Sequence, residues 1–265
     1  MNATVGDIAV RCWEVGEGEP VVLIHGLADD HRAWRRVVAD LMLDHRVILY
    51  NLRGHGGTEL GTPDGTLAQL SDDLLGLCET LELKRPLLAG FSLGGTIAMR
   101  AALDAPDRIG PLALVATSSR VGRAARGWYA ERAAMVHDAA ENLRATLDQD
   151  TADVYQAQPA ETEAGLLIRR SATADPRGYA NACRAMAALG EQPLDDELDQ
   201  IAAMTVILAG EEDQHCPPRA AQIIAERIPS SRMEVYPGAG HPLPVERPGE
   251  VAAAIRALSL SEPAR

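Results

Sequence analysis

The sequence predicts an α/β protein with a mostly parallel central sheet, helices on both faces and a helical cap. The short runs 21–24, 47–50, 87–90 and 112–115 are apolar throughout, as strands covered on both faces require. Segments with helical spacing of apolar residues separate these runs, and 67–83 is the clearest of them. Apolar strands that alternate with amphipathic helices indicate a parallel sheet between two layers of helices.

The other elements follow in chain order. The run 8–10 leads into Cys12 and Trp13 at the start of the chain, and the alternation of strand and helix resumes near residue 205. The predicted strands that follow the first run are 21–24, 47–50, 87–90, 112–115, 205–209 and 233–235. The predicted helices of this core are 37–43, 67–83, 93–105, 217–227 and 248–258, and we expect 259–265 to be loose.

The segment between these two halves has a different composition. It contains no run of β-branched residues, and Ala, Arg, Glu and Asp dominate it. Trp128 and Arg132 are spaced four residues apart, as on one face of a helix. We interpret 119–199 as a helical cap inserted into an α/β core that 1–118 and 200–265 form together.

The composition excludes several classes of protein. The chain has 265 residues, enough for one large core, and its net charge of −13 argues against nucleic acid as a partner. The first residues lack the basic and apolar regions of a signal peptide, and no apolar run approaches the roughly 20 residues that span a bilayer. The four cysteines are scattered, without the spacing of zinc ligands. We therefore expect a cytoplasmic protein with reduced thiols, no bound metal and no membrane partner.

The strongest chemical signal is the segment Gly90-Phe91-Ser92-Leu93-Gly94-Gly95. It fits the pattern G-x-S-x-G between a predicted strand and a predicted helix, which is the context that a nucleophile elbow needs. Glycines on both sides of the turn let the backbone pass close by, and the serine hydroxyl is held out at the edge of the sheet. We expect Ser92 to be a nucleophile, and the alternative is a glycine-rich turn with a solvent-exposed serine.

A serine needs a base and an orienting acid to act as a nucleophile. Asp213 follows the predicted strand 205–209, and His241 follows the predicted strand 233–235. Both residues lie at strand ends, in the chain order that accompanies such an elbow. We predict that Asp213 and His241 complete a triad with Ser92. The sequence leaves alternatives open, which are Glu211 or Glu212 as the acid and, among the other histidines, His215 as the base.

The charge that develops on the attacked carbonyl oxygen needs two backbone N–H donors. One is expected from Leu93, which directly follows the nucleophile. The other is expected from Leu27, because Gly26 before it permits the backbone to face the site. We expect His25 to hold this loop rather than to take part in the chemistry.

Segments spread along the chain carry a resemblance to a known family. They are His25-Gly26, Arg53-Gly54-His55-Gly56, 90–95, Gly210 to Asp213 with Pro217, and Gly238-Ala239-Gly240-His241. The chain resembles the α/β-hydrolase superfamily over nearly its whole length, and within it the 3-oxoadipate enol-lactonase-like group. Cap segments that are also similar to this group are 117–119, 127–128, 175–176 and 178–180.

One position departs from the pattern of the family. Relatives have Asp two residues before the Arg of the R-G-x-G turn, where this chain has Asn51. An amide can still form a hydrogen bond with the turn, but the charge that could pair with Arg53 is lost.

The resemblance implies a serine hydrolase without a cofactor, which cleaves a carboxylic ester or lactone through an acyl-enzyme on Ser92. A small molecule like 3-oxoadipate enol-lactone is the substrate implied by the group that the chain resembles most. Alternatives on the same triad are a cofactor-free haloperoxidase or perhydrolase and a C–C bond hydrolase. A ligand-binding protein on the same fold is a further alternative, and nothing in the sequence sets the oligomeric state.

Aromatic residues are scarce, and several of them fall in segments expected at the pocket. The chain has three Trp, five Tyr and a single Phe. Phe91 flanks the nucleophile, and Trp34 follows the loop of Leu27 at a position where relatives line the pocket. Trp128 and Tyr129 belong to the start of the cap. We expect these four rings to lie within reach of Ser92 and three of them, Trp34, Phe91 and Trp128, to bind substrate.

A cap arginine is the candidate partner for a substrate carboxylate. A guanidinium suits bidentate binding of a carboxylate, which an enol-lactone of a dicarboxylic acid carries. Arg132 is the first candidate because it shares a helix face with Trp128, and Arg169 and Arg170 are the others.

Overall fold

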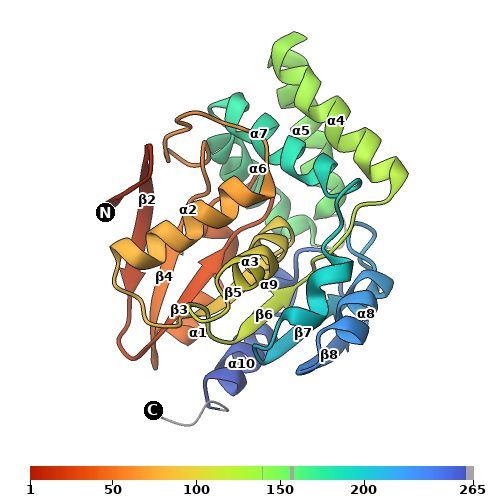
Figure 1. The fold of residues 1–265 in the computed structure, drawn as a ribbon. Helices are drawn as coiled ribbons and strands as arrows, with labels where there is room; N and C mark the ends of the chain where they lie inside the picture. The colour runs from red at the N-terminus through yellow and green to blue at the C-terminus, as the bar shows by residue number, and fades with distance from the viewer. Residues whose placement is uncertain (139, 156–157, 261–265) are drawn as a thin grey trace.

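The computed structural model describes residues 1–138, 140–155 and 158–260, and its centre is an eight-stranded sheet (Figure 1). The strands lie in the order β1-β2-β4-β3-β5-β6-β7-β8. The pairs β1–β2 and β2–β4 are antiparallel, and the other neighbours are parallel, so the predicted mostly parallel sheet is confirmed. The strands are β1 (Asn2–Val5), β2 (Ile8–Val15), β3 (Glu19–Ile24), β4 (His45–Tyr50), β5 (Leu87–Phe91), β6 (Leu112–Val115), β7 (Thr205–Gly210) and β8 (Ser231–Tyr236).

The strands in the middle of the sheet are buried on both faces, which explains their continuous apolar runs. In β3, Val22 and Ile24 belong to the hydrophobic core on one face of the sheet. Val21 and Leu23, which alternate with them, belong to the core on the other face. Side chains of a strand point alternately to opposite faces, so a layer of helices on each side requires apolar residues at every position.

Helices cover both faces of this sheet. Residues of α2, α3 and α8 pack into the core on one face, and residues of α1 and α10 pack into the core on the other. The core helices are η1 (His31–Trp34), α1 (Val38–Leu41), α2 (Leu67–Thr80), α3 (Leu93–Asp104), α8 (Pro218–Arg227), α9 (Leu243–Glu246) and α10 (Pro248–Ser259). No helix in the described part of the chain has both the length and the apolar character needed to cross a membrane.

Two elements of the first half differ from the prediction. Strand β1 was not expected, and it forms an edge hairpin with β2 in which Ala3 and Val5 are buried while Asn2 and Thr4 are exposed. The predicted helix 37–43 is shorter, because the chain turns after α1 to enter β4. Four residues are too few to show an alternating pattern by sequence alone, and short helices depend on tertiary packing.

Helices fill the segment between β6 and β7. They are α4 (Arg123–Asp138), α5 (Ala140–Val154), α6 (Pro159–Ala172), α7 (Pro176–Ala188) and the 3-10 helix η2 (Asp195–Gln200). Figure 1 shows α4 to α7 together at one end of the sheet, opposite the end where α10 lies. Their buried residues, such as Ala133, Leu147 and Cys183, form a small core that also takes in Ala28 from the loop after β3. The division into a core and a cap at 119–199 stays a prediction, and of the tail expected to be loose, 261–265 lie outside the described residues.

The turn after β4 shows what Asn51 does in place of an aspartate. Its Nδ2 donates to the carbonyl oxygen of Gly56 at 2.8 Å, and its Oδ1 accepts from the amide of His31 at 2.8 Å. The amide therefore bonds the turn, as expected. Arg53 is paired elsewhere, with Asp73 at 2.6 Å and Asp7 at 2.9 Å.

The substitution Asn51→Asp is expected to destabilise the fold by about 1–3 kcal/mol, the cost of leaving a buried polar group unpaired. A carboxylate cannot donate, so the Gly56 carbonyl would lose its partner and face a negative charge in a buried turn. Urea unfolding at pH 7 measures the loss. The comparison variant is Asn181→Asp, in which the aspartate keeps the bond that buried Asn181 Oδ1 accepts from the amide of Gly65 at 2.8 Å. It loses only the longer donation of Asn181 Nδ2 to the side-chain oxygen of Gln69 at 3.4 Å, so its loss of stability should be the smaller one. Equal losses in the two variants would contradict the role of the Asn51 donor.

Candidate active site

The turn from β5 into α3 holds Ser92 in a strained conformation. Its backbone has φ 53° and ψ −120°, in a region that residues other than glycine rarely adopt. The turn is so tight that a Cβ on Gly90 would lie 2.3 Å from the carbonyl oxygen of Gly94, and a Cβ on Gly94 would lie 2.2 Å from the carbonyl oxygen of Ile24. Both glycines of the G-x-S-x-G pattern are therefore required by space, and Ser92 is presented at the carboxyl edge of the sheet.

Hydrogen bonds with the neighbouring strand β6 and with the residues that follow it fix the backbone of Ser92. Its amide donates to the carbonyl oxygen of Val115 at 2.9 Å. Its own carbonyl oxygen accepts from Thr117 Oγ1 at 2.6 Å. Such bonds compensate for backbone strain, which persists only where the surroundings hold it.

The structure brings Ser92, His241 and Asp213 into one hydrogen-bonded chain. His241 Nε2 lies 3.1 Å from Ser92 Oγ, and His241 Nδ1 lies 2.8 Å from Asp213 Oδ2. Asp213 follows β7 and His241 follows β8, so both come from the same sheet edge as Ser92. This is the arrangement of a nucleophile, a base and an orienting acid.

Asp213 is held as a buried carboxylate. Its side chain is inaccessible to solvent, and its second oxygen, Oδ1, accepts from the amides of His215 and Cys216, each at 2.8 Å. Burial alone would raise the pKa of Asp213, but the His241 ring and the two amides outweigh burial, so the pKa lies below its ordinary value. An ionised Asp213 keeps the proton of His241 on Nδ1 and leaves Nε2 free to accept from Ser92.

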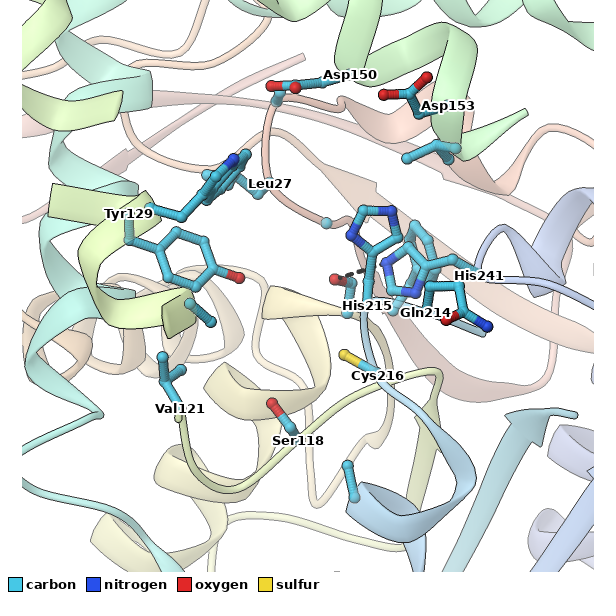
Figure 2. Close-up of a pocket in the computed structure, with 18 of the residues that line it drawn as sticks. Leu27, Ser118, Val121, Tyr129, Asp150, Asp153, Gln214, His215, Cys216 and His241 are labelled. Atoms are coloured by element: carbon cyan, nitrogen blue, oxygen red, sulfur yellow. Dashed lines mark hydrogen bonds between the residues drawn. The ribbon is translucent and has the colours of Figure 1, made fainter. Parts of the chain in front are cut away.

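The alternative residues lie outside this chain of bonds. Glu211 and Glu212 are exposed, and Glu211 accepts from the amide of Gly238. His215 lines the pocket beside His241 (Figure 2). The centroids of the two rings are 4.9 Å apart. Burial and the neighbouring His241 lower the pKa of His215 to about 4, so its ring is neutral at pH 7.

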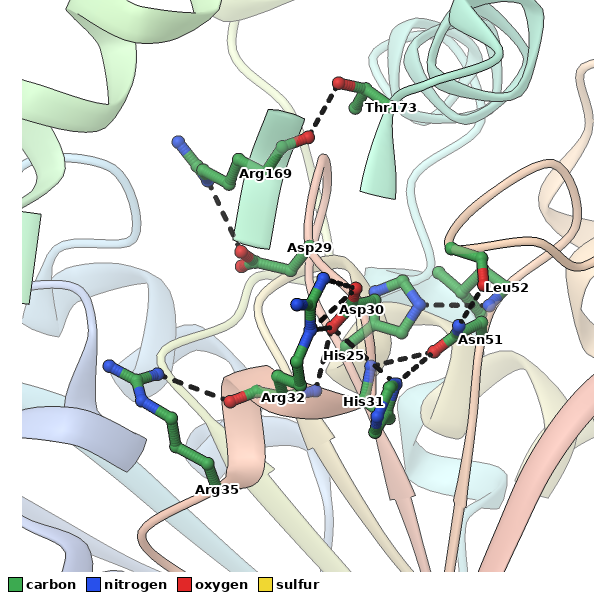
Figure 3. A network of polar contacts seen from close by, with 11 residues as sticks. His25, Asp29, Asp30, His31, Arg32, Arg35, Asn51, Leu52, Arg169 and Thr173 are labelled. Atoms are coloured by element: carbon green, nitrogen blue, oxygen red, sulfur yellow. Dashed lines mark hydrogen bonds and ion pairs between the residues drawn. The ribbon is translucent and has the colours of Figure 1, made fainter. Parts of the chain in front are cut away.

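The loop after β3 presents the amide of Leu27 beside the nucleophile. The Gly26 carbonyl oxygen accepts from His25 Nδ1 at 2.8 Å and from the amide of Asp29 at 3.3 Å. The N–H of a trans peptide points away from its C=O, so these bonds turn the Leu27 N–H to the other side. The buried His25 also accepts from the amide of Leu52 at 2.9 Å, which fixes its tautomer (Figure 3). His25 thus holds the loop, as expected from the sequence.

The Leu93 amide opens helix α3 directly after Ser92. The first amides of a helix have no partner within the helix and suit an anion. Within the described residues, neither the Leu93 nor the Leu27 amide has a hydrogen-bond acceptor. Both amides are therefore candidates to donate to a substrate oxygen at Ser92.

A cavity of about 610 Å³ extends from Ser92 and His241 up to the cap. This size suits a small-molecule site. Phe91, Trp128 and Tyr129 line it, as do Leu27 and Ser92 (Figure 2). Its charged lining residues are Asp29, Asp150, Asp153, Arg120 and Arg169. The rings of three of the four expected aromatic residues therefore belong to the pocket region.

Trp34 lies elsewhere, and the expectation that it binds substrate does not hold. Its side chain is fully buried in the core on the α1 and α10 side of the sheet, and it is absent from the described lining of the cavity. Trp34 ends the 3-10 helix η1, and its indole belongs to this core rather than to the site.

Arg132 also lies off the cavity lining. Its guanidinium pairs with Asp150 at 3.1 Å and lies over the Trp128 ring, 4.7 Å from the ring centroid. Arg170 pairs with Asp148 on the exposed side of α6. Of the three candidate arginines, Arg169 is the one that the structure places at the cavity.

Sequence reasoning missed two acids of this region. Asp29 lines the cavity directly after the Leu27 loop and pairs with Arg169. Asp150 lines it from α5 and pairs with Arg132. Neither pairing has a signal in residue spacing, because each joins helices and loops whose packing is set by the tertiary fold.

The comparison with protein families agrees with this geometry. The family model for the alpha/beta hydrolase fold matches residues 19–248. The match covers most of the chain, from β3 to the start of α10, and it includes Ser92, Asp213 and His241. The chain belongs to the alpha/beta hydrolase fold family.

Relatives of known name are similar to all or to part of the chain. 3-Oxoadipate enol-lactonase 2 of Acinetobacter baylyi is 26% identical over 260 residues, which cover 96% of this chain and 94% of that protein. The crystal structure of the enol-lactonase from Burkholderia xenovorans LB400 is 26% identical, with a TM-score of 0.88 over 98% of this chain and 100% of that one. The dihydrolipoyllysine-residue acetyltransferase component of the acetoin cleaving system of Pseudomonas putida is 36% identical over 131 residues, which cover 49% of this chain and 35% of that protein.

A buried histidine behind the loop makes stability depend on pH. Burial lowers the pKa of His55 to about 4, against an ordinary value of 6.5. Between these values the unfolded chain binds a proton that the folded protein excludes, so His55 costs stability as the pH falls from 6.5 to 4. We expect His55→Asn, whose amide can still donate to the Arg53 carbonyl that His55 Nδ1 contacts, to flatten this loss by up to about 1.4 kcal/mol per pH unit. Urea unfolding of both proteins at pH 6.5, 5.5 and 4.5 measures the slopes, and equal slopes would contradict the expectation.

Proposed function

We propose that the protein hydrolyses a carboxylic ester or lactone through an acyl-enzyme on Ser92. The observation that carries the proposal is the bonded chain from Ser92 Oγ to His241 Nε2 at 3.1 Å and from His241 Nδ1 to Asp213 Oδ2 at 2.8 Å. Membership in the alpha/beta hydrolase fold family and relatives named as enol-lactonases support it. The cavity above Ser92 provides room for a small substrate.

The first half of the proposed reaction forms the acyl-enzyme. His241 Nε2 takes the proton of Ser92 as Oγ attacks the carbonyl carbon, and Asp213 stabilises the resulting imidazolium. The amides of Leu27 and Leu93 donate to the carbonyl oxygen as it becomes negative. His241 then gives its proton to the departing oxygen, which leaves as an alcohol or, from a lactone, stays attached to the acyl chain.

The second half releases the acid. A water molecule gives a proton to His241 and attacks the acyl carbon, and the same two amides stabilise the second oxyanion. Collapse of this intermediate breaks the bond to Ser92 Oγ, which regains its proton from His241. If the substrate is an enol-lactone, the released enol becomes a ketone by tautomerisation.

The charges around the cavity favour a neutral substrate over a dicarboxylic enol-lactone. Both arginines of the lining are already paired, Arg169 with Asp29 at 3.4 Å and Arg120 with Asp195 at 3.1 Å. Asp153 adds a carboxylate whose partner is the neutral amide of Gln149. In the described lining, a substrate carboxylate would find no unpaired cation and would approach this acid.

The substitution Ser92→Ala is expected to abolish turnover of p-nitrophenyl acetate, by a factor of at least about 10⁴, because it removes the nucleophile. Circular dichroism and thermal unfolding check that the variant is folded. The matched control is Ser118→Ala, since Ser118 lines the same cavity without a bond to His241, and its activity should stay within about threefold of wild type. Retained turnover in purified Ser92→Ala would refute the nucleophile.

The charge argument is tested with two esters of the same acyl length. We expect kcat/KM for p-nitrophenyl butyrate to exceed that for the mono-p-nitrophenyl ester of succinic acid by at least about tenfold, since burial of an unpaired charge is costly. Asp153→Asn should narrow the difference between the two esters, because it removes a carboxylate of the lining whose hydrogen-bond donor is a neutral amide. Preference for the carboxylated ester would contradict the neutral substrate class and leave the role of Ser92 intact.

A further inference from the structure

Arg169 reaches from cap helix α6 to the loop that carries the Leu27 amide. Its side chain is 12% exposed, and its Nε lies 3.4 Å from Asp29 Oδ1. Its Nη2 donates to the Leu27 carbonyl oxygen at 3.4 Å, and its Nη1 to Thr151 Oγ1 of α5 at 3.4 Å. Figure 3 shows the guanidinium directed at Asp29, just outside the network around His25. One side chain of the cap thus contacts residues 27 and 29 of the loop.

The residue between these two contacts is strained. Ala28 has φ 62°, a left-handed conformation that is unfavourable for alanine. Its methyl group is buried in the small hydrophobic core of the cap, together with Leu147 and Tyr179. A strained residue persists only where the surrounding structure determines its conformation. Here cap residues contact all three residues of the loop, 27 to 29, and hold Ala28 in its conformation.

The shape of this loop sets the direction of the Leu27 N–H. The Asp29 amide donates to the Gly26 carbonyl oxygen at 3.3 Å, and that carbonyl belongs to the same peptide group as the Leu27 N–H. Displacement of Asp29 would therefore rotate the donor. Arg169 restrains this peptide group through two contacts, one with the carboxylate of Asp29 and one with the carbonyl oxygen of Leu27.

We infer that Arg169 is a positioning residue for the oxyanion site, through which the cap sets the geometry of the Leu27 donor. The inference rests on the proposed function, in which this amide stabilises the oxyanion. In this role Arg169 binds the loop of the protein itself and does not bind a substrate carboxylate. It also means that the cap contributes to the rate of the reaction as well as to the shape of the cavity.

A buried ion pair alone would not argue for a role in stability. The desolvation of two charges offsets most of their attraction, so the pair of Arg169 with Asp29 is not expected to add much to stability. Burial raises the pKa of Asp29 although Arg169 opposes the rise. Arg170, the next residue, offers the contrast, because it pairs with Asp148 at the surface of the cap and touches neither the loop nor the cavity.

The test compares Arg169→Ala, Arg169→Lys and the control Arg170→Ala with p-nitrophenyl butyrate as substrate. We expect Arg169→Ala to lower kcat by about 10- to 100-fold, less than the loss of a whole oxyanion donor, with KM within about threefold of wild type. Arg169→Lys should recover part of kcat, and Arg170→Ala should stay within about twofold. A boronic acid that mimics the tetrahedral intermediate should lose affinity in parallel with kcat, while butyrate, the product, should not.

A second variant keeps the test informative if Arg169→Ala does not fold. Asp29→Asn preserves the size of the side chain and removes the charge that Arg169 holds, and it should lower kcat and boronate affinity in the same way. The double variant should lose little more than either single variant, because both act on one contact. An unchanged kcat in these variants, or a rise in KM alone, would overturn the inference while wild-type turnover through Ser92 persists. A wild-type protein that hydrolyses no ester would remove the proposed function as well.

Discussion

The close approach of β3 to the start of α3 is the constraint on which the site depends. A Cβ on Gly94 would lie 2.2 Å from the carbonyl oxygen of Ile24, so the backbones of the two segments touch. This contact places the loop after β3 against the first turn of α3. The loop lies close to the nucleophile, since a Cβ on Gly26 would lie 3.2 Å from the Cβ of Ser92. Parallel pairing of β3 with β5 fixes the register at which they meet.

The same sheet edge explains why the triad assembles from distant parts of the chain. Parallel strands end on one side, so the loops after β5, β7 and β8 open toward a common region. Ser92 and His241 are 149 residues apart in sequence and 3.1 Å apart in space. The amides of His215 and Cys216, in the same turn, donate to Asp213 Oδ1. Asp213 Oδ2 is thereby left to accept from His241. Local turns provide the orientation, and the sheet provides the proximity.

Much of this could be predicted from sequence, because the signals are local. Apolar runs mark buried strands, and the G-x-S-x-G turn marks the nucleophile by the glycines that its geometry requires. The residues that follow parallel strands belong to one edge of the sheet, and the sequence therefore predicts that Asp213 and His241 lie near Ser92. The role expected for His25 also followed from its place before Gly26, and its bonds to that loop agree.

The packing of the cap helices and the set of residues that line the cavity could not be predicted in the same way. Helical spacing shows that Trp128 and Arg132 share a face, but not what that face meets, and Asp150 of another helix takes the guanidinium. Trp34 follows the Leu27 loop closely in sequence, yet a single turn of 3-10 helix sends its ring into the core. The pairing of Arg169 with Asp29 crosses 140 residues and depends on how the cap is seated. Substrate class therefore has to be argued from tertiary contacts.

The meeting of the two amides at Ser92 is tested most directly by a crystal structure of the protein after reaction with an alkyl p-nitrophenyl phosphonate. We expect the phosphorus to be bonded to Ser92 Oγ and its phosphoryl oxygen to lie within about 2.7–3.1 Å of both the Leu27 and the Leu93 nitrogen atoms. His241 should remain bonded to Asp213 on the other side of the adduct. An adduct on another residue, or a phosphoryl oxygen directed away from both amides, would contradict the proposed oxyanion site.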